Sequence, residues 1–139
     1  MAYWIKVTYE RNEYVVDLDR LSAFVCAPNG KITFWLPNSA FPIILHKQSN
    51  PDDYQQVWDY IQQVSAHSLS GSWIQINYER NDYLIDLNRI GSFCHSPSGK
   101  LTFWLPDSAI PLIIHEQRDP DTYQRILDYI KRKTGHILP

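Results

Sequence analysis

The sequence predicts an α+β protein of two tandem repeats, each with about five antiparallel strands and one C-terminal helix, packed with pseudo-twofold symmetry. The first observation is an internal repeat: the segment GKITFWLP at 30–37 returns as GKLTFWLP at 99–106, which is 69 residues later. At this offset about half of the positions in the two halves are identical, with no insertion between them. The second observation is hydrophobic periodicity, which alternates through most of each half and becomes helical near its end.

The repeat also sets the expected domain boundaries. We expect a first repeat unit at residues 1–66, a linker at 67–71, a second unit at 72–135 and a C-terminal tail at 136–139. A unit of this size is near the lower limit for folding alone. We therefore expect the two units to form one compact domain, with two units that barely touch as the alternative.

Each unit begins with three predicted strands. Apolar and polar residues alternate along the first two, which is typical of half-buried strands. Polar turns and an Asp-Arg or Asn-Arg corner separate the three strands. The predicted strands are 3–9, 14–18 and 22–27 in the first unit, and 72–78, 83–87 and 91–96 in the second.

A turn containing proline and glycine then leads into the fourth strand, which is the repeated segment itself. Pro37 and Pro106 end this strand, because proline cannot donate a hydrogen bond to a neighbouring strand. The fifth strand, at 43–46 and 112–115, is apolar on both faces. This composition predicts an interior position in a sheet.

The helix of each unit has a clear start. Asn50 and Asp119 are capping residues, and each precedes a proline at the first helical position. The apolar residues that follow recur at helical spacing along one stripe, which predicts one buried face.

The composition is that of an ordinary globular protein, with 44% hydrophobic and 20% charged residues. The net charge of −2 argues against nucleic acid and against an acidic membrane surface as partners. No apolar run approaches the roughly 20 residues that span a bilayer, so we expect a cytoplasmic protein. Cys26 and Cys94 are not equivalent under the repeat, which predicts two free thiols.

Catalytic motifs are missing from the sequence: it contains no HExxH, no glycine-rich loop before a helix and no nucleophile elbow. We therefore expect no enzymatic activity and no cofactor. His46, His95 and His115 each lack the further ligands that a metal site needs, so we expect no metal either. Each of these imidazoles is better explained as a strand-edge side chain with a backbone partner.

The leading functional hypothesis is a non-catalytic protein–protein interaction module that acts as an adaptor, assembly factor or regulator. It would bind a peptide or the terminal tail of an assembly subunit through sheet edges and aromatic pockets. The motivation is the duplication and the high aromatic content, with five Trp and nine Tyr. The candidate partner-binding residues are Trp35, Trp104, Trp4, Trp73, Tyr60, Tyr129, Arg20 and Arg89.

Each candidate also has a structural explanation. Trp35 and Trp104 could pack under the helix or against the other unit, which is favoured because Trp is usually largely buried. Trp4 and Trp73 could cover a strand end. Arg20 could pair with Asp17 at the strand corner, and the tyrosines could cover the margin of the helical stripe.

Two further alternatives remain open. The chain could be a small-molecule sensor or an unrecognised enzyme, with a site between the repeats around Cys94 and His95. It could also form a homodimer through leftover sheet edges, although the fused pair of units could already meet that need.

Overall fold

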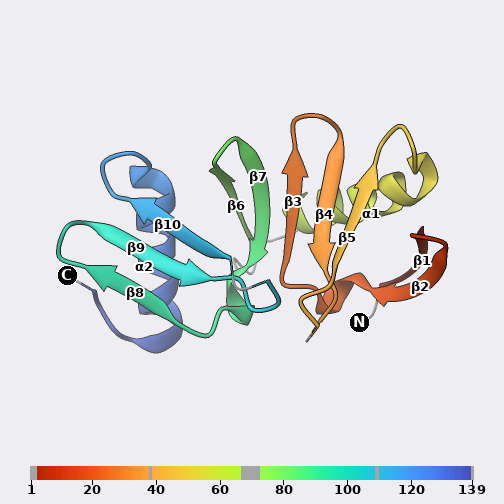
Figure 1. Cartoon of the computed structure of the whole chain (residues 1–139). Coiled ribbons are helices and arrows are strands. Elements are labelled where there is room, and N and C mark those ends of the chain that lie inside the picture. Colours follow the sequence, from red (N-terminus) through yellow and green to blue (C-terminus); the bar gives the residue numbers. More distant parts are fainter. Residues whose placement is uncertain (1–2, 38, 67–72, 109, 139) are drawn as a thin grey trace.

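The computed structural model describes residues 3–37, 39–66, 73–108 and 110–138. These residues form ten antiparallel strands in three sheets, two α-helices and two short 3-10 helices. The protein therefore has the predicted α+β class, with two similar halves that each place a helix after five strands (Figure 1). The expected linker, 67–71, lies outside the described residues.

The elements of the two halves correspond one to one. The first half contains β1 (Trp4–Tyr9), β2 (Asn12–Asp17), η1 (Leu18–Arg20), β3 (Ala23–Ala27), β4 (Lys31–Trp35), β5 (Pro42–His46) and α1 (Pro51–Ala66). The second half contains β6 (Trp73–Tyr78), β7 (Asn81–Asp86), η3 (Leu87–Arg89), β8 (Phe93–Ser96), β9 (Lys100–Trp104), β10 (Pro111–His115) and α2 (Pro120–Thr134).

The two halves share their largest sheet. This five-stranded sheet has the order β5-β4-β3-β7-β6, so that β3 of the first half pairs with β7 of the second. The hairpin β1–β2 forms a separate two-stranded sheet, and β10-β9-β8 forms a three-stranded sheet. In Figure 1 the five-stranded sheet lies in the middle, with the other two sheets at opposite ends of the molecule.

Two hydrophobic cores lie on opposite faces of this central sheet. Successive residues of a strand point to opposite faces, so Phe24 of β3 joins the core of the first half while Val25 joins the core of the second. Strand β7 is divided in the same way, since Leu84 packs in the first core and Ile85 in the second. Each half thus contributes side chains to the core of the other.

The fifth strand of each half is at a sheet edge, so the prediction of an interior position is wrong. Among the strands that the structure describes, β5 pairs only with β4, and β10 pairs only with β9. Ile43 and Leu45 are fully buried and Ile44 is half-buried, which explains the apolar composition. Composition reports what covers the two faces of a strand, and it does not report whether another strand pairs with its edge.

Turns and helix starts follow the local sequence. Gly30 and Gly99 have φ of 79° and 83°, the left-handed conformation that their hairpins need and that glycine adopts without steric cost. The Asp119 side chain accepts a hydrogen bond from the backbone N–H of Thr122, as a helix cap does. Cys26 and Cys94 are free thiols, as predicted. Neither described helix is long and apolar enough to cross a membrane.

Candidate functional site

Four loops gather along one edge of the molecule, at the top of Figure 1. We call them the loop edge. The loop edge consists of the turns β3–β4 (28–30), β5–α1 (47–50), β6–β7 (79–80) and β10–α2 (116–119). Three of these turns lie at one end of the central sheet, and the β10–α2 turn follows an edge strand of the three-stranded sheet. The backbone of the strands therefore fixes the positions of the side chains that these turns carry.

The turn between β6 and β7 lies in the middle of the loop edge (Figure 1). Tyr78 pairs with Asn81 across it, so Glu79 and Arg80 form a two-residue loop. Their φ values are 48° and 69°, the signature of a type I′ turn, in which Asn-Gly is the favoured pair. Two long charged residues occupy this strained conformation instead, and both are exposed. Strain of this kind is often retained where a side chain has a function.

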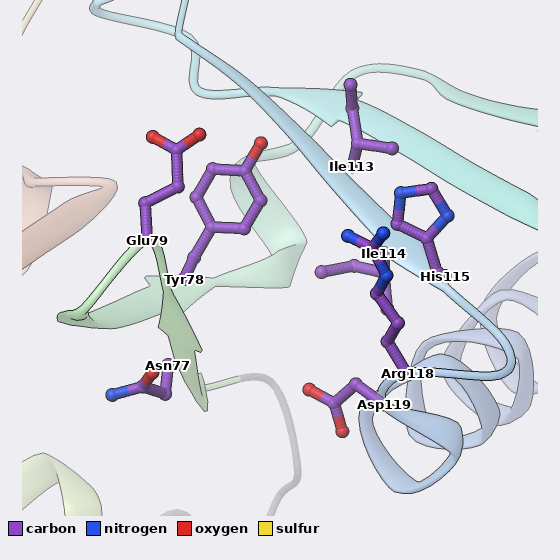
Figure 2. Close-up of a pocket in the computed structure, with 8 residues that line it drawn as sticks. All are labelled: Asn77, Tyr78, Glu79, Ile113, Ile114, His115, Arg118 and Asp119. Atoms are coloured by element: carbon purple, nitrogen blue, oxygen red, sulfur yellow. The ribbon is translucent and has the colours of Figure 1, made fainter.

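A pocket of about 640 Å³ lies between this hairpin and the start of α2. Figure 2 shows Tyr78 and Glu79 on the hairpin side of it, with His115, Arg118 and Asp119 on the opposite side. The pocket thus combines an exposed guanidinium and an imidazole with two carboxylates. Such a mixture can bind polar groups, and Arg118 supplies its fixed positive charge.

A second pocket, of about 570 Å³, lies on the other side of the same hairpin. Arg80 and Lys47 supply its positive charge and Asp82 its negative charge. The rings of Tyr54 and Trp58 also line it, stacked 6.3 Å apart with an interplanar angle of 11°. The hairpin β6–β7 therefore borders both pockets, and Arg80 lines the second, which offers flat aromatic rings beside cations.

The thiol in the second pocket is not activated. Burial raises the pKa of Cys26 to about 11, and the negative charge of Asp82 acts in the same direction. Burial also raises the pKa of Tyr54, with a contribution from Cys26. A nucleophilic cysteine needs a depressed pKa, so Cys26 is not a candidate nucleophile.

The four predicted tryptophans are divided between the core and the surface. Trp73 packs on the first core and Trp35 on the second, so each lies against the opposite half, as the structural explanation of Trp35 requires. Trp4 and Trp104 remain exposed, with 61% and 42% of their surface accessible. No tryptophan of this group lines either pocket of the loop edge.

The predicted arginines hold strand corners. Arg20 Nε lies 3.6 Å from a carboxylate oxygen of Asp17, and Arg89 Nε lies 3.7 Å from one of Asp86. Arg89 also donates to the backbone carbonyls of Asp19 at 2.7 Å and Arg20 at 3.2 Å, across the boundary between the halves. The local explanation given for Arg20 thus agrees with the structure.

Tyr60 and Tyr129 are buried, so the structure does not place them as exposed contact residues. The Tyr60 hydroxyl donates to Asp19 at 2.6 Å, and the Tyr129 hydroxyl donates to Asn88 at 2.5 Å. Each helix is thereby attached to the 3-10 helix of its own half. This arrangement agrees with the alternative in which they cover the margin of the helical stripe.

The residues suggested for a sensor or enzyme are not brought together. Cys94 is exposed on β8, whereas the half-buried His95 lies 2.5 Å from the hydroxyl of Tyr123. Adjacent strand residues point to opposite faces, so this pair does not form one site.

The candidate partner-binding residues selected from the sequence did not include Lys47, Arg80 or Arg118. A signal was present, because two of these cations depart from the repeat: Glu116 corresponds to Lys47, and Ser49 corresponds to Arg118. What the sequence alone did not reveal is that three turns far apart in the chain lie along one edge.

Comparisons with known proteins give one similarity in structure. No family model matches the chain, and no curated protein matches it in sequence. Its structure is similar to a solved LytTr DNA-binding domain of a response regulator from Bacillus cereus, with a TM-score of 0.51 and 7% sequence identity. The similarity covers 88% of this chain and 95% of that one. At this identity it establishes a shared fold.

This neighbour overturns two expectations from the sequence. The adaptor or assembly factor that binds a protein or peptide is wrong as the leading hypothesis, and so is the exclusion of nucleic acid as a partner. The exclusion relied on a net charge of −2 for the whole chain. Contacts with nucleic acid depend instead on the cations that the fold presents on one side.

Proposed function

We propose that this chain binds double-stranded DNA through the loop edge. The observation that carries the proposal is the similarity in fold to a LytTr DNA-binding domain, which extends over nearly the whole of both chains. A fold can support unrelated functions, so the proposal also needs a surface suited to the ligand. The loop edge is the part of the described surface that we assign to this role.

The cations of the loop edge suit contacts with the DNA backbone. Arg80, Lys47 and Arg118 are exposed and come from three different turns. Arg and Lys side chains form charge-assisted hydrogen bonds with phosphate oxygens, and arginine can use two donors at once. Contacts of this kind position a protein on the duplex.

The hairpin β6–β7 suits entry into a groove. Strand ribbons fit the major groove, which is about 12 Å wide. Arg80 at the tip of this hairpin then faces the groove, while Lys47 and Arg118 flank it on the two sides. Arginine is also the side chain that most often reads guanine, so we assign base contact to Arg80 and phosphate contact to the other two.

The role that we propose is non-catalytic. It is the binding of DNA in the cytoplasm. The neutral Cys26 thiol and the separated Cys94 and His95 support a binding role. The overall charge of −2 means that regions outside the loop edge contribute little attraction, so we expect binding to weaken steeply with salt.

The test uses fluorescence anisotropy of a labelled DNA duplex over a series of salt concentrations. The variant R80A/K47A/R118A should lose roughly tenfold or more in affinity and lower the slope of log K against log salt by about 2, since each of its two phosphate contacts contributes about 0.9. The matched control K6A/R125A/K131A removes the same charge from exposed positions outside the loop edge. It should retain most of the affinity and the slope.

Two results would contradict the proposal. The first is no binding of the unmodified chain to duplex DNA even at low salt. The second is an equal loss of affinity in the two triple variants, which would assign the attraction to overall charge and not to this edge.

A further inference from the structure

The boundary between the two halves is a strand pairing with a defined register. Ala23 of β3 lies opposite Ile85 of β7, and the pairing continues in register to Cys26 and Asp82. Leu84 of β7 lies opposite Phe24 and is buried in the core of the first half, with 5% of its surface accessible. The pairing is extended by a hydrogen bond from the Asp86 N–H to the Ser22 carbonyl at 2.9 Å.

Three side chains reinforce this internal junction. The Trp73 ring lies 6.1 Å from the Phe24 ring, on the core of the opposite half. The Trp35 ring packs on the second core. The Arg89 guanidinium donates to the carbonyls of Asp19 and Arg20. A junction between two units of this type therefore involves four side chains that contact the opposite half: Leu84, Trp73, Trp35 and Arg89.

The strands corresponding to β3 and β7 have no such partner among the described strands. The counterpart of β3 is β8, which pairs there only with β9, and the counterpart of β7 is β2, which pairs only with β1. Figure 1 shows β8 and the β1–β2 hairpin at opposite ends of the molecule, so they do not reach each other within one chain. Within the described residues, each copy thus has two unpaired strand edges, on β8 and β2, and these are the counterparts of the β3 and β7 edges that pair with each other.

The side chains around these two edges are counterparts of those at the internal junction. Under the 69-residue offset Leu84 corresponds to Val15, Trp73 to Trp4 and Trp35 to Trp104. Val15 is 67% exposed, Trp4 61% and Trp104 42%, and all three are among the large hydrophobic residues that the structure leaves in solvent. Arg89 corresponds to Arg20, whose side chain is 74% exposed.

We propose that copies of this chain associate head to tail, with β8 of one copy paired to β2 of the next, in the register of the β3–β7 junction. This register places Phe93 opposite Val15 of the second copy and Cys94 opposite its Tyr14. Phe93 is half-buried, with its ring 5.7 Å from the Phe103 ring. Val15 then packs beside Phe93 as Leu84 packs beside Phe24.

The remaining groups in this register are also complementary. His95 lies opposite Glu13 of the second copy, where the internal junction has Cys26 and Asp82, and an imidazole N–H can donate a hydrogen bond to a carboxylate. Trp4 of the second copy covers Phe93, and its Arg20 donates to carbonyls of η3. Association therefore removes from water the apolar surface that the single chain exposes.

The contact is heterologous, because two different surfaces meet. Such contacts form a ring when the rotation closes and an open array when it does not. A closed pair of copies leaves neither β2 nor β8 unpaired, so the proposal predicts a dimer or a larger assembly, and it is independent of DNA binding.

The first test is the mass of the protein in solution by analytical ultracentrifugation over a wide concentration series. The unmodified chain should associate as concentration rises, with a blue shift of Trp emission as Trp4 and Trp104 become buried. Val15→Lys should weaken association roughly tenfold or more. The matched control Trp58→Lys changes another exposed apolar residue, which belongs to α1 and lines the second pocket of the loop edge, and should associate normally.

The second test measures the register by disulfide trapping. In a Cys26→Ser background, Tyr14→Cys places a thiol opposite the native Cys94, where paired Cβ atoms lie about 5 Å apart. Mild oxidation should give covalently linked copies on a non-reducing gel. The control Glu13→Cys points to the other face and should react much more slowly.

A monomer at every concentration would overturn the proposal, and so would association that Val15→Lys leaves unchanged. Equal trapping in the two cysteine variants would overturn the register. Circular dichroism of each variant verifies the fold, and if Tyr14→Cys does not fold, the mass of the unmodified and Val15→Lys chains decides the question.

Discussion

At the residue scale, the same position in the two halves often carries a different chemistry. Tyr60 donates to the carboxylate of Asp19, whereas Tyr129 donates to the neutral amide of Asn88. Burial raises the pKa of Tyr60, and the hydrogen bond and charge of Asp19 raise it further. Burial also raises the pKa of Tyr129, but the positive charge of Arg132 partly opposes this effect. Tyr129, with its neutral acceptor, is therefore an internal control for the effect of a charged hydrogen-bond acceptor on the stability contributed by Tyr60.

Tyr60→Phe should lower the free energy of unfolding by about 1.5–3 kcal/mol at neutral pH, the range for a hydrogen bond to a charged group. A raised pKa in the folded state means that the stabilisation is present below the ordinary tyrosine pKa of about 10 and is lost as pH rises above it. The difference between the unmodified chain and Tyr60→Phe should therefore shrink above about pH 10. Urea unfolding over a pH series measures it.

The control for this prediction is Tyr129→Phe, which removes a hydrogen bond to a neutral acceptor and should show a weaker dependence on pH. Stability curves of the unmodified chain and Tyr60→Phe that stay parallel through the alkaline range would contradict the expected coupling to Asp19.

At the element scale, the hairpins β1–β2 and β6–β7 have nearly identical turns. Glu10 and Arg11 have φ of 49° and 69°, and Glu79 and Arg80 have 48° and 69°. A left-handed conformation is unfavourable for residues with a Cβ atom. Of these two hairpins, the second stands between the two pockets of the loop edge. The β1–β2 hairpin therefore serves as a control: it has the same turn conformation, with its effect on stability, but no proposed role in binding DNA.

The variant Glu79→Asn/Arg80→Gly should fold with equal or greater stability, by up to about 1 kcal/mol, because Asn-Gly is the favoured type I′ pair. It should nonetheless lose most of its affinity for duplex DNA. Glu10→Asn/Arg11→Gly should gain similar stability and keep its affinity. Thermal unfolding and fluorescence anisotropy measure the two effects. Full DNA affinity in the first variant would show that Arg80 has no part in binding.

At the scale of the whole molecule, the shared sheet couples the two halves. Leu84 belongs to the second half but is buried in the core of the first, beside Phe24. Trp73 crosses the boundary in the same direction, and Trp35 crosses in the other. A substitution that destabilises one half is therefore expected to destabilise the other half as well.

Leu84→Ala should reduce the free energy of unfolding by about 2–5 kcal/mol, the range for a buried leucine, and unfolding should remain a single transition. The matched change Val15→Ala, at the exposed counterpart, should cost much less when the protein is dilute. Chemical denaturation followed by Trp fluorescence and by circular dichroism measures both. Two separate transitions in the unmodified chain would indicate that the halves fold independently.

Much of the fold could be predicted because local patterns are repeated. The alternation around Ile5 and Val7 predicts β1, and the cap followed by Pro51 or Pro120 predicts the start of each helix. The candidate site was harder to predict, since Lys47, Arg80 and Arg118 are far apart in the chain. Only the pairing of strands and the packing of the three-stranded sheet on the second core place their turns along one edge.

The sequence by itself determined the duplication, the order of strands and helix in each half, and the free state of both cysteines. These properties depend on neighbours in the chain and on the 69-residue offset. The tertiary structure decided that β3 pairs with β7, while β2 and β8 have no corresponding partner among the described strands. The reason is physical: two similar repeats offer similar strand edges, and only the three-dimensional path of the chain determines which of them meet.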